Sequence, residues 1–274
     1  MPSAPSTPSP IVTPAIQVEH LVARYEERTI LEDVSFEVRR GERFVIVGGS
    51  GCGKTTLLRH IIGLQRPAAG RVLIDGDDVG RADEDQLRRI QRKFGVLFQA
   101  GALFGSLTLG ENVALPLEEY TTLPKHIIEL LVRIKLSMVS LAGFEEFMIS
   151  ELSGGMKKRA ALARAIALDP SILFFDEPSA GLDPITSAEL DELIVQLNRS
   201  LGTTIVVVSH ELSSIFTIAD RVIMLDGEAK GIVAEGDPRE LRERHPDPRV
   251  HAFFNRHPRA SAHGRRMESG HRNA

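Results

Sequence analysis

The octapeptide GGSGCGKT, residues 48–55, constrains the fold more than any other stretch of the chain. It satisfies the pattern G-x-x-x-x-G-K-[ST], it follows the apolar run 43–47, and a helical pattern begins at Lys54. Glycines let backbone N–H groups turn toward phosphate oxygens, and a helix N-terminus adds partial positive charge. We therefore predict a strand, a phosphate-binding loop and a helix, in that order.

The side chains of this loop predict a nucleotide bound with a divalent cation. Lys54 is expected to reach the β- and γ-phosphates, and Thr55 to ligate Mg²⁺ through its hydroxyl. The alternative is a glycine-rich turn that matches by chance, and the strand and helix on its two sides argue against it. The only cysteine, Cys52, occupies a freely varying position and is interpreted as a bystander. The predicted ATP-binding residues of the loop are Gly48, Gly49, Ser50, Gly51, Cys52, Gly53, Lys54, Thr55 and Thr56.

Short apolar, β-branched runs recur along the chain and alternate with helical patterns. This order predicts an α/β fold with a mostly parallel, buried sheet. Two segments with strand-like alternation, 16–23 and 29–38, precede the loop. The block at about 101–167 has helical periodicity and no convincing strand, so we predict a helical subdomain inserted into the core. The apolar runs are 43–49, 71–74, 94–98, 172–175, 204–208 and 222–225.

Composition fits a soluble protein of one large domain. The chain has 274 residues, of which 42% are hydrophobic and 26% charged, and a net charge of −4 gives no general attraction to nucleic acid. No apolar run reaches the roughly 20 residues of a membrane span. Residues 1–14 are rich in Pro and Ser and predict a disordered arm instead of a signal peptide, which favours the cytoplasm. The basic segment 239–274 is interpreted as a partly disordered extension, with contact to the dimer or a partner as the alternative.

A second acidic motif, SILFFDEPSAGLD at residues 171–183, ends an apolar run in adjacent carboxylates. A strand buried in such a sheet places Asp176 at its carboxyl edge, where ligands of open α/β sheets bind. Asp176 is then a candidate for holding Mg²⁺, and Glu177 for orienting and deprotonating an attacking water. The alternative is a strand that ends in a solvated acidic turn.

The segment ELSGGMKKRAALARAIALDP, residues 151–170, resembles the ATP-binding-cassette (ABC) ATPases, because LSGGM matches their signature LSGGQ with Met156 in place of Gln. The resemblance implies a P-loop NTPase with a RecA-like core, an N-terminal antiparallel β subdomain and the helical insert. It also implies a head-to-tail homodimer, in which Ser153, Gly154 and Gly155 of one chain face the ATP on the other.

Four more positions follow the order of this family, over about residues 16–236. Tyr25 corresponds to the aromatic that stacks on adenine, with a surface tyrosine as the alternative. Gln99 corresponds to the glutamine that senses Mg²⁺ and the attacking water, and is counted with Thr55 and Asp176 as a metal ligand. Asp183 links the two sites across the dimer. His210 contacts the γ-phosphate; a structural histidine is the alternative.

Within the family, the stretches FGVLFQAGALFGSLTLGENVALPL and DEPSAGLDPITSAELDELI resemble Mla-type (maintenance of lipid asymmetry) phospholipid transport ATPases. The resemblance implies an inner-membrane permease, an MCE-domain protein and, as an optional partner, a STAS-domain subunit. The ATPase would lie on the cytoplasmic face, with no direct nucleic-acid partner. An amino-acid or small-solute importer ATPase and a soluble nucleic-acid-linked ATPase are the alternatives.

The uncharged stretch FQAGALFGSLT, residues 98–108, leads from Gln99 toward the helical block. In transporter members of the family, this is where a short helix of the permease docks. We expect part of the stretch to line that groove, and the alternative is a buried connector that includes Leu103 and Phe104.

Overall fold

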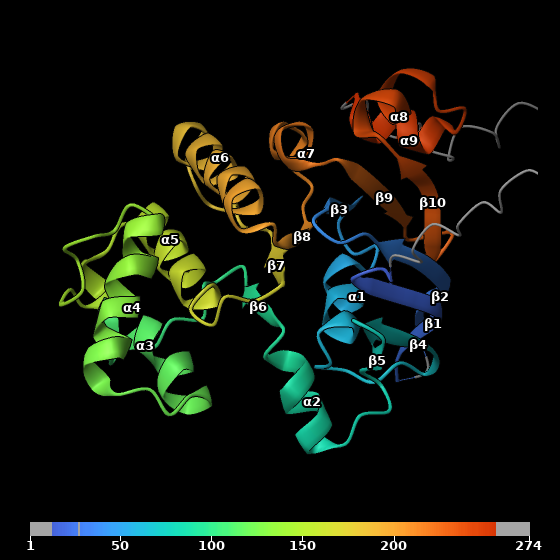
Figure 1. Cartoon of the computed structure of the whole chain (residues 1–274). Helices are drawn as coiled ribbons and strands as arrows, with labels where there is room; N and C mark the ends of the chain where they lie inside the picture. The colour runs from blue at the N-terminus through green and yellow to red at the C-terminus, as the bar shows by residue number, and fades with distance from the viewer. Residues whose placement is uncertain (1–12, 27, 256–274) are drawn as a thin grey trace, which may run out of the picture.

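The computed structural model describes residues 13–26 and 28–255, in which a six-stranded sheet carries helices on both faces (Figure 1). The strand order is β10-β9-β3-β8-β7-β6, and all neighbours are parallel except β9 and β10. The predicted, mostly parallel α/β sheet is therefore confirmed. Its strands are β3 (Arg43–Gly48), β6 (Phe94–Leu97), β7 (Ile172–Asp176), β8 (Thr204–Val208), β9 (Arg221–Asp226) and β10 (Gly231–Gly236).

A second, antiparallel sheet has the order β2-β1-β4-β5. The run 71–74, which the sequence grouped with the strands of the parallel sheet, lies here instead. The reason is its pairing, since Ile74 stands opposite Ile16 in the register of β4 and β1. The strands are β1 (Ile16–Tyr25), β2 (Arg28–Val38), β4 (Ala69–Ile74) and β5 (Asp77–Asp78).

The six-stranded sheet separates two apolar clusters, and its strands divide their side chains between them. On β3, Phe44 and Ile46 enter the cluster that faces the antiparallel sheet, whereas Val45 and Val47 enter the cluster that faces the helices. All four side chains are buried. This period of two is the geometry of a strand covered on both faces, and it explains the continuous apolar runs in the sequence.

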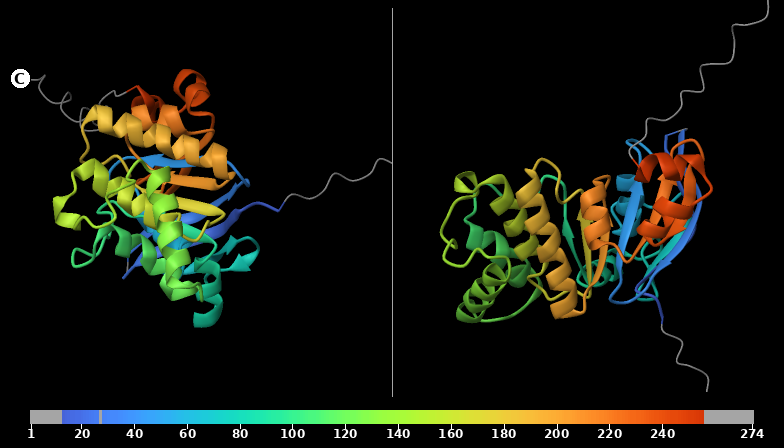
Figure 2. Two further views of the ribbon diagram at one scale, coloured as in Figure 1. Left: turned by 60° about the vertical axis from the view of Figure 1, so that its left-hand side comes forward. Right: turned by 90° about the horizontal axis from the view of Figure 1, so that it is seen from above.

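The predicted helical block contains α3, α4 and α5, at the end of the molecule opposite the antiparallel sheet (Figure 2). Its buried residues belong to the same cluster as one face of the six-stranded sheet, so the block shares a core with that sheet. Helix α2 was not predicted from the sequence. The helices are α1 (Lys54–Ile61), α2 (Glu84–Gln91), α3 (Leu109–Tyr120), α4 (Lys125–Met138), the 3-10 turn η1 (Ile149–Glu151), α5 (Gly154–Ala165), α6 (Pro184–Leu201) and α7 (Leu212–Ile218).

The first part of the C-terminal extension, which the sequence analysis interpreted as partly disordered, is folded. Two seven-residue helices, α8 (Pro238–Arg244) and α9 (Pro248–Phe254), follow β10, and Val250 and Phe254 are buried against the helix-side cluster. Helices this short carry little periodic signal in an Arg-rich segment, which is why the sequence missed them. The remainder of the extension, 256–274, and residues 1–12 of the N-terminal arm lie outside the described residues. Within 13–26 and 28–255, no helix is both long and apolar enough to cross a bilayer.

Candidate nucleotide-binding site

A cleft of about 640 Å³ lies beyond the carboxyl ends of β3, β6, β7 and β8. Open α/β sheets bind ligands at this edge. The cleft brings together residues that the sequence assigned to separate motifs, because parallel neighbouring strands end at one level. Its lining is Ile30, Gly48, Gly49, Ser50, Gly51, Gly53, Lys54, Thr55, Thr56, Gln99, Glu177, His210 and Phe253. Ile30 and Phe253 were not predicted, since neither belongs to a motif.

The glycine loop between β3 and α1 presents backbone amides and one buried cation. Gly48 has φ +149°, and a Cβ there would clash with the Leu225 carbonyl oxygen and lie 2.6 Å from Cys52 Sγ. Gly53 is the N-cap of α1 in the left-handed conformation, and no side chain caps the helix. Lys54 Nζ donates to the carbonyls of Gly48 (3.0 Å) and Gly49 (3.1 Å). The uncapped helix start and the lysine form an anion cradle.

Two oxygen ligands suited to Mg²⁺ meet beside the cradle. The Thr55 hydroxyl donates to Asp176 Oδ1 at 3.2 Å, although 121 positions separate the two residues. Burial raises the pKa of Asp176, and the hydrogen bond from Thr55 opposes that rise. Hydroxyl and carboxylate oxygens are ligands that Mg²⁺ accepts, so the donor set fits this cation.

Glu177 and His210 form a second polar pair at the mouth of the cleft. His210 Nδ1 lies 2.8 Å from each carboxylate oxygen of Glu177. Glu177 follows β7 with φ +50°, a left-handed conformation that a non-glycine residue adopts at a cost and that clusters at functional sites. The pair places the carboxylate of Glu177 in the same cleft as the glycine loop, so Glu177 stays a candidate for the general base.

The signature residues form a separate group on the surface, away from the cleft of their own chain. Ser153 is the N-cap of α5, and its hydroxyl accepts from Met156 N at 3.2 Å. A Cβ on Gly155 would lie 2.6 Å from Thr186 Cγ2, so this loop packs beside the start of α6. Asp183 caps α6 and accepts from the amides of Ile185 and Thr186 at 3.1 Å. Ser153, Gly154, Gly155 and Asp183 are not among the residues that line the cleft.

Tyr25 likewise does not line the cleft. It is the last residue of β1 and is 68% exposed. Its stacking on adenine therefore stays a prediction. Cys52 is buried, which raises the pKa of its thiol and disfavours the reactive thiolate. This environment is consistent with a bystander role for Cys52.

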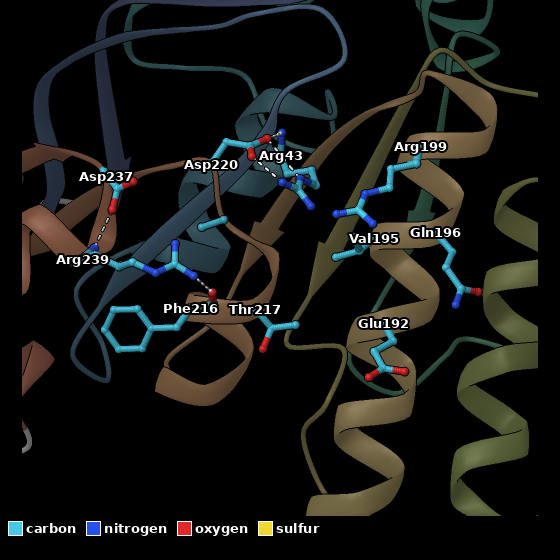
Figure 3. Close-up of a pocket in the computed structure, with 11 residues that line it drawn as sticks. Arg43, Glu192, Val195, Gln196, Arg199, Phe216, Thr217, Asp220, Asp237 and Arg239 are labelled. Carbon is cyan, nitrogen blue, oxygen red and sulfur yellow. Dashed lines mark hydrogen bonds and ion pairs between the residues drawn. The ribbon is translucent and has the colours of Figure 1, made fainter.

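A second cavity of about 620 Å³ lies at the amino end of β3, between α6, α7 and α8 (Figure 3). Three of its charged side chains are engaged with one another or with the backbone: Arg43, Asp220 and Arg239. Arg43 Nε donates to Asp220 Oδ2 at 3.1 Å, and Arg239 Nη2 donates to the Phe216 carbonyl at 2.9 Å. Asp237 caps α8. The bond from Arg239 joins the extension to α7, and we assign no chemistry to this cavity.

The parallel sheet, the glycine loop and the adjacent carboxylates Asp176 and Glu177 define a P-loop nucleotide-binding protein. The family model described as "ABC transporter" matches residues 31–180. The chain is 46% identical to the intermembrane phospholipid transport system ATP-binding protein MlaF of Escherichia coli (strain K12), over 83% of each protein. It is 43% identical to the probable ribonucleotide transport ATP-binding protein mkl of Mycobacterium leprae, over 88% of this chain and 69% of that protein. The chain belongs to the ABC transporter family.

Solved structures show the same fold. The dimeric post-hydrolysis state of the ATP-binding cassette MJ0796, bound to ADP and Pi, superposes with a TM-score of 0.74 at 31% identity. The match covers 81% of this chain and 98% of that one. The predicted fold and family are therefore confirmed, and the chain is an ATP-binding ABC ATPase. The roles of individual site residues stay predictions.

Proposed function

We propose that this chain is the ATP-hydrolysing subunit of a transporter that moves phospholipid between membranes. The supporting observation is its 46% identity to an MlaF protein over 83% of both chains. The motifs alone support an ABC ATPase with any cargo, because the cleft contacts nucleotide and not lipid. The choice of phospholipid as the cargo therefore depends on the sequence identity to the MlaF protein over 83% of each chain.

The geometry supports a specific division of labour in the cleft. Lys54 donates to the Gly48 and Gly49 carbonyls here, and we infer that it donates to the β- and γ-phosphates when ATP is bound. Thr55, Asp176 and Gln99 would hold Mg²⁺, which would supply positive charge to offset that of the phosphate oxygens. Glu177 takes the proton of the attacking water, and His210 orients the carboxylate and contacts the γ-phosphate.

The surface location of the signature group supports a head-to-tail homodimer. One chain would present Ser153, Gly154, Gly155 and Asp183 to the nucleotide in the cleft of the other. ATP then closes the dimer, and loss of the γ-phosphate releases it. In this proposal the chain consists of a cassette at 15–238, with its helical subdomain at about 101–167, and an extension at 239–274. The extension contacts the other chain of the dimer or a partner protein.

We further propose that a permease helix docks on the stretch 98–108 and holds the ATPase at the cytoplasmic face of the inner membrane. Phe104 is 51% exposed there, Ala102 is exposed, and Leu103 and Leu107 are half-buried. A mixed apolar surface of this kind suits a protein partner. An MCE-domain protein and an optional STAS-domain subunit complete the proposed complex.

Purification of the tagged chain from its native membrane tests the proposal. We expect an integral permease and an MCE-domain protein to co-purify with bound phospholipid, and the ATPase activity to persist in lipid nanodiscs. Recovery with a periplasmic solute-binding protein, and without an MCE-domain protein, would contradict the lipid assignment. Ribonucleotide is the second candidate cargo, because the relative from Mycobacterium leprae is named for its transport. Bound ribonucleotide in place of lipid would favour it.

A further inference from the structure

Helix α5 holds the backbone of the segment that follows β6 through two cationic side chains. Lys158 Nζ donates to the main-chain carbonyl of Gln99 at 2.6 Å, across 59 positions of sequence. Arg164 Nη2 donates to the carbonyl of Gly101 at 3.1 Å, and its guanidinium lies 5.9 Å from the centre of the Phe104 ring. The segment that carries Gln99 is therefore fastened to α5 at successive points.

Lys158 is unusual for a lysine because it is only 7% exposed. Lysine is rarely buried unless its ammonium is paired, and three N–H donors have to be satisfied. The Gln99 carbonyl accepts one of them, and the nearby charges of Asp176 and Glu177 favour the protonated ammonium, although burial lowers the pKa of Lys158. The cation therefore lies within the electrostatic range of the two acidic residues of the cleft, while bonded to the backbone of a third cleft residue.

The same helix begins at the signature glycines. Gly154 is the first residue of α5 and Lys158 is four residues further on, a distance of about 6 Å along the helix axis. A helix moves as a rigid unit over so short a distance. Any displacement of the signature loop is therefore passed directly to the Gln99 carbonyl through the ammonium of Lys158.

We propose that Lys158 is a positioning residue for ATP hydrolysis: it sets the backbone from which the Gln99 side chain reaches the nucleotide, and so couples the signature loop to the chain's own cleft. This inference rests on the proposed roles of Gln99 and of the head-to-tail dimer. When a partner's nucleotide draws in the signature loop, α5 moves and carries Gln99 with it. Lys158 itself is not among the residues that line the cleft.

The test compares Lys158→Met with Lys157→Met in the full-length chain with Mg²⁺ and ATP. Lys157 lies on the same helix and is half-exposed, and its side chain forms no hydrogen bond or ion pair among the described residues. Lys157→Met therefore removes the same charge without breaking a side-chain contact. We expect Lys158→Met to lower kcat roughly 10- to 100-fold, the scale of a misplaced catalytic group, and to change the Kd for ATP less than about threefold. Lys157→Met should leave both values near wild type. Near-normal kcat in Lys158→Met would overturn the proposal.

Two further variants separate positioning from a loss of folding. Lys158→Arg keeps the charge and a donor, and Lys158→Gln keeps only a donor, so kcat should fall in the order wild type, Arg, Gln, Met.

In a Gln99→Ala background, Lys158→Met should lower kcat almost no further, because the effects of two residues that act through one group do not add. Additive losses would mean that Lys158 acts on stability instead. Full activity of Gln99→Ala would contradict the proposed role of Gln99, an outcome that can be told apart from a failure of Lys158.

Discussion

Two helices of this chain begin at a glycine-containing turn, and the two turns are prepared for an anion in different ways. No side chain caps α1, so its first amides are left to a ligand, and Lys54 stands beside them. In α5 the hydroxyl of Ser153 already accepts from Met156 N. The first turn is a cradle ready for phosphate, whereas the second is stabilised without a ligand.

The surroundings of the two turns also differ, because the first turn lines the cleft and the second does not. The start of α1 lies in the cleft with Asp176, Glu177 and His210 close by. The start of α5 is exposed and packs beside α6. We therefore expect the first turn to belong to the chain's own part of the catalytic site, and the second to be a half-site that a second copy of the chain would bring its nucleotide to. Substitutions at the two turns should fail at different stages.

The largest effect is expected from Glu177→Gln in the cleft. The carboxylate that faces His210 is lost, so kcat should fall roughly 10² to 10⁴-fold, the range for removal of a general base. ATP should still bind, because the cradle is intact, and the dimer should persist. Steady-state turnover and nucleotide binding measured on one preparation check this. Near-normal turnover would remove Glu177 from its proposed role.

A loss of nucleotide binding is expected from Gly48→Ala. The new methyl group meets the Leu225 carbonyl and Cys52 Sγ, at a φ of +149° that disfavours a side chain. Strain of about 1 to 3 kcal/mol should weaken ATP binding roughly 10-fold or more. Titration with a fluorescent ATP analogue measures it. Unchanged affinity would show that the loop adjusts without cost.

The contrasting change, Gly154→Ala, should spare the single chain. A Cβ there finds only Leu182 Cδ2, at 3.7 Å, and alanine favours a helix. The Kd for ATP and the melting temperature should stay near wild type, while kcat falls about 10-fold, because the partner's phosphate loses its close approach to the backbone. Size-exclusion chromatography with ATP, in the Glu177→Gln background, should show a weaker dimer. An equal loss of ATP affinity would contradict the half-site.

A smaller effect is expected from Met156→Gln, which restores the usual signature residue. Met156 is half-buried and packs against the helix-side cluster, so we expect the glycine amides, and not this side chain, to supply the phosphate contact. We expect turnover to change less than about threefold, since a net hydrogen bond contributes about 1 kcal/mol. A gain above 10-fold in steady-state turnover would show that this position contacts nucleotide directly.

The smallest effect concerns pH and the helix behind the cradle. His60 of α1 is buried, its Nδ1 lies 3.0 Å from the Gln65 carbonyl, and its Nε2 has no hydrogen-bond partner among the described residues. Burial lowers the pKa of His60 below its value in the unfolded chain, about 6.5. The unfolded state therefore binds more protons below that pH, and stability falls as the pH drops through this value.

Thermal unfolding at pH 7.5 and 5.5 measures this dependence. Wild type should lose more stability on acidification than His60→Gln, by at most about 1.4 kcal/mol for each pH unit. His60→Gln is also the control for the other histidines, because both chains contain them. Equal losses in the two chains would place the pH dependence elsewhere.

Local sequence was enough to predict the chemistry of the cleft, because a phosphate cradle needs consecutive residues. Residues 48–55 carry the loop, the cation and a metal ligand in one octapeptide, and Asp176 and Glu177 are adjacent in sequence. The strands that are covered on both faces were also predictable, since this burial demands unbroken apolar runs such as β7 and β8. The signature motif was recognisable for the same reason, as five consecutive residues.

Only the tertiary structure decided which of these pieces meet. It brings His210 to 2.8 Å from Glu177 across 33 positions, and it keeps the signature loop out of the cleft of its own chain. It also buries Lys158 against the Gln99 carbonyl and folds the Arg-rich extension into α8 and α9. No local pattern encodes these contacts, because each depends on how helices pack on a sheet whose strand order, 10-9-3-8-7-6, differs from the order of the chain.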